Sequence, residues 1–339
     1  MNAKRRQESW RIAVLGAGSW GTALALHACA AGHEVSLWAR RPEAAEAMSR
    51  TRENADYLPA FELPQSLQIG SDAHACMAGA DLVLSVVPSR YLRRVWDEIA
   101  PGFPTGAHLV SATKGLEDQT GLRMTEVLEE YAGGRYASLL ALSGPSFAAE
   151  LAQGHPTAVT LACTDLAAAA SVQSCLSSGC LRAYRNGDLI GVEHGGALKN
   201  VIAIATGISD GLGFGTNTRA ALITRGLKEL SALAVARGAV PTTLMGLAGL
   251  GDLVLTCTGP LSRNRRVGVE LGGGTRLEDI IDGMHMVAEG VETTAAAFRL
   301  GRQMGVKMPI TEEVNAILHE GKDPRAAIEN LMARTLVEE

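Results

Sequence analysis

The stretch AVLGAGSWGTALA, from Ala13 to Ala25, decides the fold of the first half of this chain. An apolar run ends at Gly16, and Gly18 and Gly21 complete G-x-G-x-x-G before small and apolar residues resume at helical density. This order predicts a strand, a tight turn and a helix: Gly16 makes the turn, Gly18 admits a pyrophosphate, and Gly21 allows close packing. The helix N-terminus favours that anion. The stretch therefore predicts dinucleotide binding, against the alternative of a merely tight turn.

The end of the next strand selects the cofactor. Glu34 to Ala39 is predicted as that strand, and Arg40 and Arg41 follow it where an acidic residue would bind the ribose 2′-hydroxyl of NAD. Two guanidinium groups favour a 2′-phosphate, so we expect NADP, with NAD possible. The alternative is that both are ordinary solvated surface arginines.

The composition excludes several classes of protein. A length of 339 residues is typical of two domains, and 47% hydrophobic with 20% charged residues is ordinary for a globular protein. A net charge of -5 argues against nucleic acid as the main partner. No apolar run approaches the length of a membrane span, and the basic start, Lys4 to Arg6, is followed by a predicted strand rather than the apolar segment of a signal peptide. We expect a cytoplasmic protein.

The cysteines predict a reducing compartment. None of the six belongs to a C-x-x-C pair, and no histidine stands at metal-ligand spacing. They are interpreted as buried free thiols, and no metal site is expected.

Further apolar runs follow at the spacing of a doubly wound α/β sheet. Ala80 to Val87, His108 to Ala112 and Tyr136 to Leu142 are predicted strands, with a crossover helix from Arg90 to Ile99. Ligands bind beyond the carboxyl ends of such strands, and these ends are followed by a lysine, Lys114, and a flexible SGPS turn. Lys114 is a candidate functional residue at this edge, although a solvated loop lysine is an equally good interpretation.

The pattern of predicted secondary structure changes at the turn-rich stretch RNGDLIG, Arg185 to Gly191. Beyond it the strand and helix alternation stops and helical patterns with short breaks follow. We predict an α/β Rossmann-type domain over residues 10–187 and an all-α substrate-binding and catalytic domain over residues 188–339. The predicted helices of the second domain are 216–237, 266–271, 290–304, 310–318 and 325–331.

One lysine in the second domain has no local ion partner. In VEHGGALKNVIAIATG, the helical neighbours of Lys199 are Gly195, Gly196, Ile202 and Ala203. Such a lysine either reaches solvent or is buried with a lowered pKa. A desolvated lysine is a good proton donor to an oxygen that gains charge as a hydride arrives. Lys199 is therefore a candidate general acid.

Two later stretches point to the same chemistry. Asp252, in GLGDLVLTC, stands between glycine and an apolar run, where burial requires a partner, plausibly a lysine. SRNRR, Ser262 to Arg266, suits a phosphate or carboxylate ligand, or it is a solvated basic turn.

Taken together, the motifs resemble the bacterial NAD(P)-dependent glycerol-3-phosphate dehydrogenases over nearly the whole length. The resemblance rests on GAGSWGTALA, SATKGLE, LSGPSFAAE, GGALKNVIAIATGI, GLGDLVLTCTG, SRNRR, MVAEGVETT and MPI, in that order. It implies reversible reduction of dihydroxyacetone phosphate to sn-glycerol 3-phosphate for phospholipid synthesis. It also implies a homodimer and a helical domain similar to the C-terminal domain of 6-phosphogluconate dehydrogenase.

The resemblance also implies residue roles. Lys199 becomes the general acid and base, assisted by Lys114 and Asp252. The implied substrate-binding residues are Lys114, Gly144, Ser146, Lys199, Asn200, Asp252, Thr256, Ser262, Arg263 and Asn264. The implied cofactor-binding residues, beside Gly16, Gly18, Gly21 and Arg41, are Ser19, Trp20, Arg40, Tyr57, Lys114, Ala148, Arg263, Val287 and Glu289.

The chain departs from the family pattern at Thr216, Gly259 and His194, none of which has a proposed catalytic role. Two alternatives stay open. A 3-hydroxyacid or 6-phosphogluconate type dehydrogenase also joins a dinucleotide domain to a helical one, although the spacing from GGALKN to SRNRR argues against it. A non-catalytic NADP-binding sensor predicts that Lys114, Lys199 or Asp252 is missing, and all three are present.

Overall fold

The chain forms two compact units. The computed structural model describes residues 9–284 and 288–335. The first unit comprises Met1–Thr113 and Thr125–Leu189, and the second comprises Lys114–Met124 and Ile190–Glu339. The short segment Lys114–Met124 thus belongs to the second unit, although the chain on either side of it belongs to the first.

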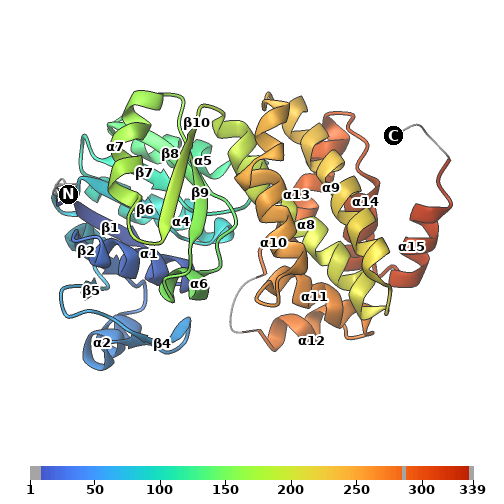
Figure 1. Ribbon diagram of the computed structural model, residues 1–339, viewed down its shortest axis with the longest axis horizontal. Coiled ribbons are helices and arrows are strands. Elements are labelled where there is room, and N and C mark those ends of the chain that lie inside the picture. Colours follow the sequence, from blue (N-terminus) through green and yellow to red (C-terminus); the bar gives the residue numbers. More distant parts are fainter. Residues whose placement is uncertain (1–8, 285–287, 336–339) are drawn as a thin grey trace, which may run out of the picture. The chain divides into compact units, whose positions relative to one another are not determined.

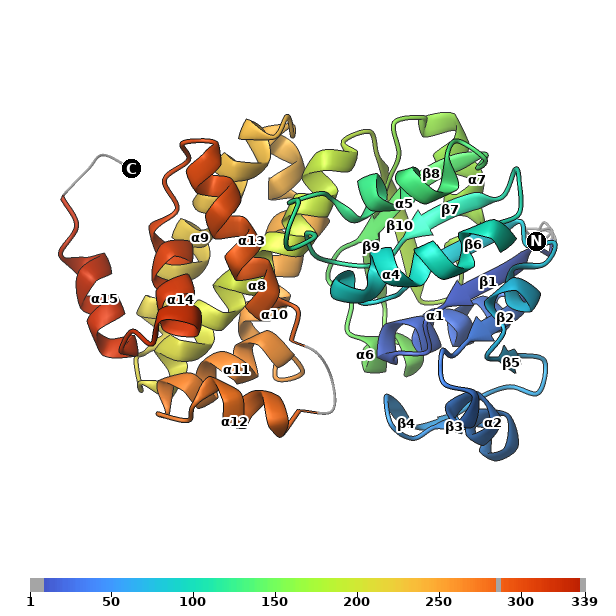
Figure 2. The ribbon, with the colours of Figure 1, turned by 180° about the vertical axis from the view of Figure 1, so that it is seen from behind.

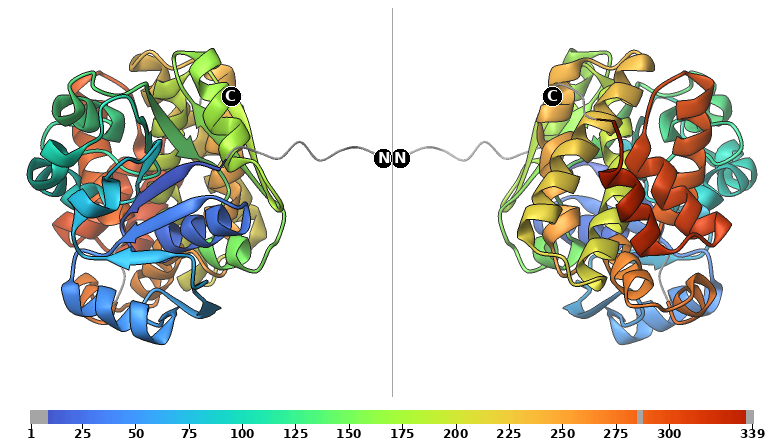
Figure 3. Two further views of the ribbon diagram at one scale, coloured as in Figure 1. Left: turned by 90° about the vertical axis from the view of Figure 1, so that its left-hand side faces the viewer. Right: turned by 90° about the vertical axis from the view of Figure 1, so that its right-hand side faces the viewer.

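The first unit is built on an eight-stranded sheet in the order β10-β9-β8-β7-β6-β1-β2-β5. All neighbouring strands are parallel except β8 and β9. The strands are β1 (Arg11–Leu15), β2 (Glu34–Trp38), β5 (Gln68–Gly70), β6 (Leu82–Ser85), β7 (His108–Ser111), β8 (Ser138–Ser143), β9 (Thr157–Ala162) and β10 (Leu181–Asn186). Figure 3 shows β1, β2 and β5 side by side in its left panel.

Helices cover both faces of this sheet, which is why its central strands are apolar throughout. In β6, Leu82, Val83 and Leu84 are all fully buried. Helix α7 lies in front of the sheet in Figure 1, whereas α4 and α5 lie in front in the reverse view of Figure 2. The helices of this region are α1 (Ser19–Ala30), α2 (Pro42–Thr51), α3 (Ala73–Met77), α4 (Ser89–Ile99), α5 (Met124–Ala132), α6 (Ala148–Ala152) and α7 (Leu166–Leu176). The Rossmann-type prediction is confirmed.

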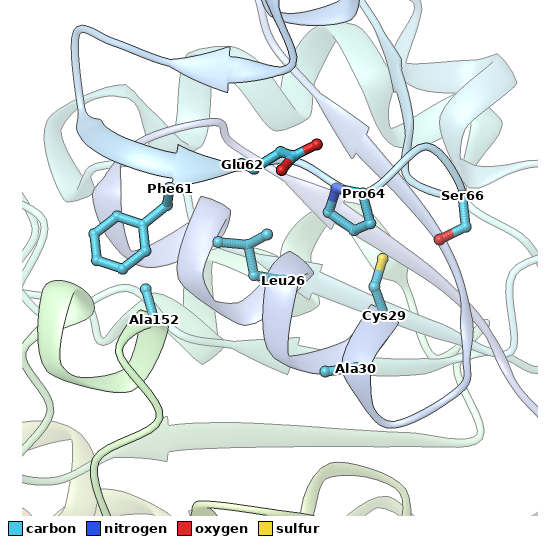
Figure 4. Close-up of a pocket in the computed structure, with 8 residues that line it drawn as sticks. All are labelled: Leu26, Cys29, Ala30, Phe61, Glu62, Pro64, Ser66 and Ala152. Atoms are coloured by element: carbon cyan, nitrogen blue, oxygen red, sulfur yellow. The ribbon is translucent and has the colours of Figure 1, made fainter.

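The sequence between α2 and β5 forms a small hairpin rather than a simple break. Its strands, β3 (Glu53–Asn54) and β4 (Leu58–Glu62), pair antiparallel. Beneath this hairpin, a pocket lies along the second half of α1 and is lined by Leu26, Cys29, Ala30, Phe61, Glu62, Pro64, Ser66 and Ala152 (Figure 4). Burial raises the pKa of Cys29 to about 11, so its thiol stays protonated at neutral pH.

The second unit is helical, as predicted. Its helices are α8 (Leu189–Gly211), α9 (Thr216–Ala236), α10 (Asp252–Thr258), α11 (Arg263–Gly272), α12 (Leu277–Asp282), α13 (Gly290–Gln303), α14 (Pro309–Glu320) and α15 (Pro324–Met332). Helix α8 is its centre, because every residue from Gly191 to Ser209 is buried. Helices α14 and α15 pack together, as the right panel of Figure 3 shows. Among the described residues, no helix is long and apolar enough to cross a membrane.

Glycines bring α8 and α11 into backbone contact. A Cβ atom on Gly207 would lie 2.1 Å from the carbonyl oxygen of Arg265, and one on Gly268 would lie 2.2 Å from that of Ile204. Gly211 and Gly272 repeat this approach one turn later. Only glycine permits such proximity, so the start of α11 is held directly against α8.

Helix α11 begins three residues earlier than the predicted 266–271. The hydroxyl of Ser262 accepts a hydrogen bond from the N–H of Arg265 at 3.2 Å and so caps the helix. The basic stretch SRNRR is therefore the first turn of a helix.

Candidate functional site

In the first unit, the three glycines of the loop after β1 have distinct surroundings. Gly16 has φ = +122°, and a Cβ there would lie 2.8 Å from the carbonyl oxygen of Val86. A Cβ on Gly21 would lie 1.9 Å from the carbonyl oxygen of Gly16. At Gly18, by contrast, a Cβ would meet no atom within 4 Å. The first and third glycines close the turn, and the second leaves open space.

The helix that follows is suited to bind a diphosphate. Helix α1 has no side-chain cap at Gly18 and no acidic residue in its first turn, so its N-terminal dipole is not neutralised locally. The indole Nε1 of Trp20 is buried and has no acceptor among the described residues. This open cradle and the unsatisfied indole fit a dinucleotide.

The hairpin formed by β3 and β4 is hydrogen-bonded to this glycine loop and to the start of α1. Ser19 donates from its hydroxyl to the carbonyl oxygen of Tyr57 at 2.6 Å. Asn54, which is 3% exposed, donates to the carbonyl oxygen of Ala17 at 2.9 Å and contacts Thr22 Oγ1 at 2.8 Å. Sequence reasoning selected Tyr57 but missed Asn54, whose only signal was its place in the turn-rich stretch NADYLP.

Arg40 and Arg41 lie beyond β2 on the surface, each with a neighbour. Arg41 Nη2 lies 3.2 Å from Asp56 Oδ2, in an exposed ion pair. The Arg40 guanidinium lies 5.6 Å from the ring centre of Tyr91, over which Arg90 also lies at 4.5 Å. Because these contacts are exposed and weak, both arginines can still turn to an anionic ligand.

The SGPS turn follows β8 in the first unit. Gly144 has φ = +138°, and its would-be Cβ lies 3.0 Å from Val159 Cα. The Ser146 hydroxyl donates to the carbonyl oxygen of Gly144 at 2.9 Å, and Ala148 is the first residue of α6. Two of these predicted residues, Gly144 and Ser146, thus lie in one turn, and Ala148 begins the helix that follows it.

In the second unit, two lysines, Lys199 and Lys114, contact the same carboxylate, that of Asp252. Asp252 Oδ1 forms an ion pair with Lys199 Nζ, and Asp252 Oδ2 accepts a hydrogen bond from Lys114 Nζ at 2.8 Å. The side chains of Asp252 and Lys199 are 1% and 6% exposed, and that of Lys114 is 16% exposed. Asp252 is thus paired, as its apolar surroundings require.

This arrangement lowers the pKa of Lys199 to about 7. The largest cause is burial, which disfavours the charged amine; Asp252 opposes that effect and the Lys114 ammonium adds to it. The close approach of backbone behind the lysine maintains the burial, since a Cβ on Gly195 would lie 2.6 Å from the carbonyl oxygen of Ala248. An amine of this kind exchanges a proton readily at neutral pH.

Beside the lysine, hydrogen bonds orient two asparagines. Asn264 donates from Nδ2 to Asn200 Oδ1 at 2.9 Å, and its own Oδ1 accepts from the N–H of Gly290 at 2.9 Å. The amide nitrogen of Asn200 is thereby the group with which this residue can donate to a ligand. Thr256 donates its hydroxyl to the carbonyl oxygen of Asp252 at 2.6 Å. Sequence reasoning missed Gly290, where a Cβ would lie 2.7 Å from Asn264 Oδ1.

The three arginines of SRNRR are not equivalent. Arg265 pairs with Asp210 at 2.6 Å, and Arg266 pairs with Glu270 at 2.7 Å. Arg263 is exposed and makes no ion pair or side-chain hydrogen bond with a described residue. As the first residue of α11, it is the arginine best placed to receive an anion.

The stretch before α13 holds the last predicted cofactor residues. Burial raises the pKa of Glu289 above its usual range, and the charge of Arg263 opposes this shift. Val287 lies outside the described residues.

The comparisons with known proteins agree with this geometry. The family model of the NAD-dependent glycerol-3-phosphate dehydrogenase N-terminus matches residues 11–169, and that of the C-terminus matches residues 188–329. A glycerol-3-phosphate dehydrogenase, NAD(P)+, of Geobacter sp. (strain M21) is 52% identical over 327 residues, which is 96% of this chain and 98% of the relative. One of Koribacter versatilis is 53% identical over 327 residues, which is 96% and 97% of the two chains.

A solved structure is similar over the same length. The crystal structure of glycerol-3-phosphate dehydrogenase from Coxiella burnetii has a TM-score of 0.92 and 40% sequence identity, and the match covers 96% of this chain and 99% of that one. The two family models and the close relatives span both units. This chain therefore belongs to the family of NAD(P)-dependent glycerol-3-phosphate dehydrogenases.

Proposed function

We propose that this enzyme catalyses the reversible, NAD(P)H-dependent reduction of dihydroxyacetone phosphate to sn-glycerol 3-phosphate, with Lys199 as general acid and base. The observation that carries the proposal is the shared carboxylate of Asp252. It holds one buried lysine whose pKa is about 7 and a second, more accessible lysine that remains beside it. Family membership supports the substrate, because the relatives are named for it.

The bound nicotinamide supplies the hydride that C2 of the substrate receives. The work of the protein is to protonate the carbonyl oxygen as it gains charge. Lys199 gives its proton to that oxygen in reduction and recovers one from the hydroxyl in oxidation. Asp252 keeps Lys199 in place, and Lys114 contributes a positive charge beside the developing oxyanion.

The substrate is held mainly by the start of α11 and its neighbours. Arg263 provides a guanidinium for the phosphate, with Asn264 and Ser262 alongside. Asn200 presents its amide nitrogen, and Thr256 lies on the turn of α10 that carries Asp252. Gly144 and Ser146 add contacts from the turn after β8.

The cofactor is held by the glycine loop, Ser19, Trp20 and Tyr57 for the diphosphate and its surroundings, and by Arg40 and Arg41 for the 2′-phosphate. Ala148, Lys114, Arg263, Val287 and Glu289 complete the proposed set. The 2′-phosphate contacts favour NADP, while the weak surface setting of the arginines leaves NAD acceptable.

We also propose a cellular role, a location, an oligomeric state and a domain division for this enzyme. The product supplies glycerophospholipid synthesis, the enzyme acts in the cytoplasm, and it works as a homodimer. The functional domains are residues 10–187 and 188–339, with the loop that carries Lys114 contributed by the first of these in sequence.

The test is a spectrophotometric assay of dihydroxyacetone phosphate reduction with NADPH and NADH side by side. Faster oxidation of NADPH supports the substrate and the role of Arg40 and Arg41. Oxidation of NADH alone keeps the reaction but removes the arginines from the cofactor site. Absence of oxidation with either, in protein that binds NADPH, overturns the proposed reaction.

A further inference from the structure

The loop that carries Lys114 is a small hairpin built into the second unit. Leu116 is buried in the apolar core of that unit and forms an antiparallel bridge with Arg123. The N–H of Glu117 donates to the carbonyl oxygen of Leu122 at 2.9 Å, and that of Gly121 donates to Glu117 at 2.8 Å. These bonds make residues 116–123 one compact piece, which begins two residues after Lys114.

Two ion pairs attach this hairpin to helices of the second unit. Arg299 on α13 pairs with Asp118 at 2.6 Å, with side chains 44% and 55% exposed. Arg123 Nη1 pairs with Glu193 Oε2 at 2.6 Å, with side chains only 11% and 5% exposed. Solvent screens the first pair and makes it a weak restraint. The second is the stronger restraint, because its two side chains are largely buried and solvent screens their attraction much less.

Glu193 lies on α8, the helix that also carries Lys199. The hairpin is thus fixed to α8 near the start of that helix through Arg123. At its N-terminal end, Lys114 contacts the Asp252 carboxylate, which Lys199 also contacts. The hairpin therefore has one contact with α8 and another with the carboxylate that both lysines share.

We propose that Arg123 and Glu193 are positioning residues for the reaction: their buried ion pair holds the hairpin on α8 and so keeps Lys114 on Asp252 beside Lys199. This inference rests on the proposed role of Lys199 in proton transfer. If the pair is lost, the hairpin shifts, the ammonium of Lys114 withdraws, and Asp252 serves Lys199 alone. The pKa of Lys199 then rises, because one of the causes that lower it has been removed.

Among the residues that the structure describes, four charged or titratable groups interact with Lys199. They are Asp252 and Cys257 on α10, Lys114 on the hairpin, and Glu289 before α13. Burial raises the pKa of Cys257 to about 12, so this thiol does not titrate near neutrality. None of the proposed substitutions changes these four groups. Arg123→Lys and the double variant also leave the net charge of the pair unchanged, so a shift of the pH profile in these two reports on the placement of Lys114.

The experiment compares Glu193→Gln and Arg123→Lys with the control Glu313→Gln. Glu313 pairs with Lys322 in the same unit, with side chains 17% and 24% exposed, and has no described link to the hairpin. We expect Glu193→Gln to lower kcat on the order of 10²-fold, as for a misplaced catalytic group. We also expect the pH midpoint of the reduction to move upward. Arg123→Lys keeps a positive charge for Glu193, so its kcat and its pH midpoint should lie between those of Glu193→Gln and the unmodified enzyme. The control should change kcat by no more than about twofold and leave the pH midpoint where it is.

A double variant covers the case in which a single one does not fold. Arg123→Met combined with Glu193→Leu removes both charges of this pair together, so thermal denaturation should still show a folded protein. A purely structural role lowers Tm or the fraction of active enzyme without moving the pH midpoint. An unmoved midpoint in folded Glu193→Gln, or in the folded double variant, overturns the positioning role. If instead Lys199→Met keeps the kcat of the unmodified enzyme, it is the proposed function that fails.

Discussion

Lys114 Nζ lies 2.8 Å from Asp252 Oδ2, on the oxygen of this carboxylate opposite the one that contacts Lys199. One buried carboxylate is thus shared by two amines. Lys199 is the more buried of the two, and burial lowers the pKa of its amine to about 7. The proposed proton transfer rests on this burial.

The first prediction concerns the pH dependence of the reaction. Reduction needs the protonated amine, so kcat for reduction should fall by about tenfold per pH unit above the pKa of Lys199. That pKa is about 7, lowered from 10.5. Oxidation needs the neutral amine and should rise over the same range and then level off. Steady-state rates in both directions between pH 5 and 10 test this, and a reduction rate that stays flat to pH 9 contradicts it.

A second prediction concerns cofactor preference. Asp56 forms an exposed ion pair with Arg41 at 3.2 Å, so in the proposed cofactor site it would compete with the 2′-phosphate for this arginine. Asp56→Asn should raise the ratio of kcat/KM for NADPH over NADH by roughly two- to fivefold, as expected for an exposed pair. Glu46→Gln removes one surface charge from α2 and serves as the control. An unchanged ratio in Asp56→Asn, or an equal change in the control, removes Asp56 from the cofactor site.

Stability should depend on pH through Glu229, a buried carboxylate of α9 outside the site. Its oxygens accept the N–H groups of Ile310 at 2.7 Å and Thr311 at 3.1 Å, at the start of α14. Burial is the main cause that raises its pKa to about 7 from 4.5. Between these values the folded protein binds a proton that the unfolded chain has lost, so Glu229 reduces stability as pH rises from 4.5 to about 7.

Thermal denaturation at several pH values measures this effect. Glu229→Gln cannot titrate and should show a smaller fall in Tm across that range than the unmodified protein, whereas the exposed control Glu278→Gln should match the unmodified protein. Glu229→Ala leaves the two N–H groups without their acceptor and should cost about 1–3 kcal/mol. If Tm depends on pH equally in Glu229→Gln and in the unmodified protein, the pKa of Glu229 is not raised in the folded state.

The glycine contact between α8 and α11 should matter for both stability and substrate binding. Gly268→Ala places a methyl group 2.2 Å from the carbonyl oxygen of Ile204, so the helices must separate. We expect a loss of about 1–3 kcal/mol in the free energy of unfolding and a higher KM for dihydroxyacetone phosphate, since Asn264 moves away from Asn200. Gly273→Ala is the matched control, because its Cβ comes no closer than 3.4 Å to any atom. Equal KM values for the two variants would show that the contact does not position the site.

Much of the fold and part of the candidate site could be predicted from the sequence. The glycine loop and the apolar strands carry local signals, because backbone sterics and burial on both faces restrict the residues allowed there. Lys199 and Asp252 were found because charge in an apolar run needs a partner. Their pairing with each other across 53 positions of the chain is compatible with that rule, but the rule alone does not choose the partner.

The rest depends on contacts between distant parts of the chain. Asn54 and Gly290 act through hydrogen bonds to residues that are not their sequence neighbours, and neither stands in a pattern that reveals it. Arg123 and Glu193 are 70 positions apart, and in the sequence each resembles an ordinary surface charge. They form a pair only because the folded segment 114–124 packs against α8. The early start of α11 was missed because Ser262 and the arginines after it resemble a basic turn, although the same serine is a good helix cap.

The central claim is that Lys199 carries the proton, and Lys199→Met tests it most directly. The measurement is kcat for dihydroxyacetone phosphate reduction, together with the Kd for NADPH from fluorescence titration and with the exposed Lys228→Met as control. The account predicts that Kd stays within about twofold and that kcat falls by about 10²- to 10⁴-fold, as for loss of a general acid. A Lys199→Met enzyme that binds NADPH and keeps the kcat of the control contradicts it.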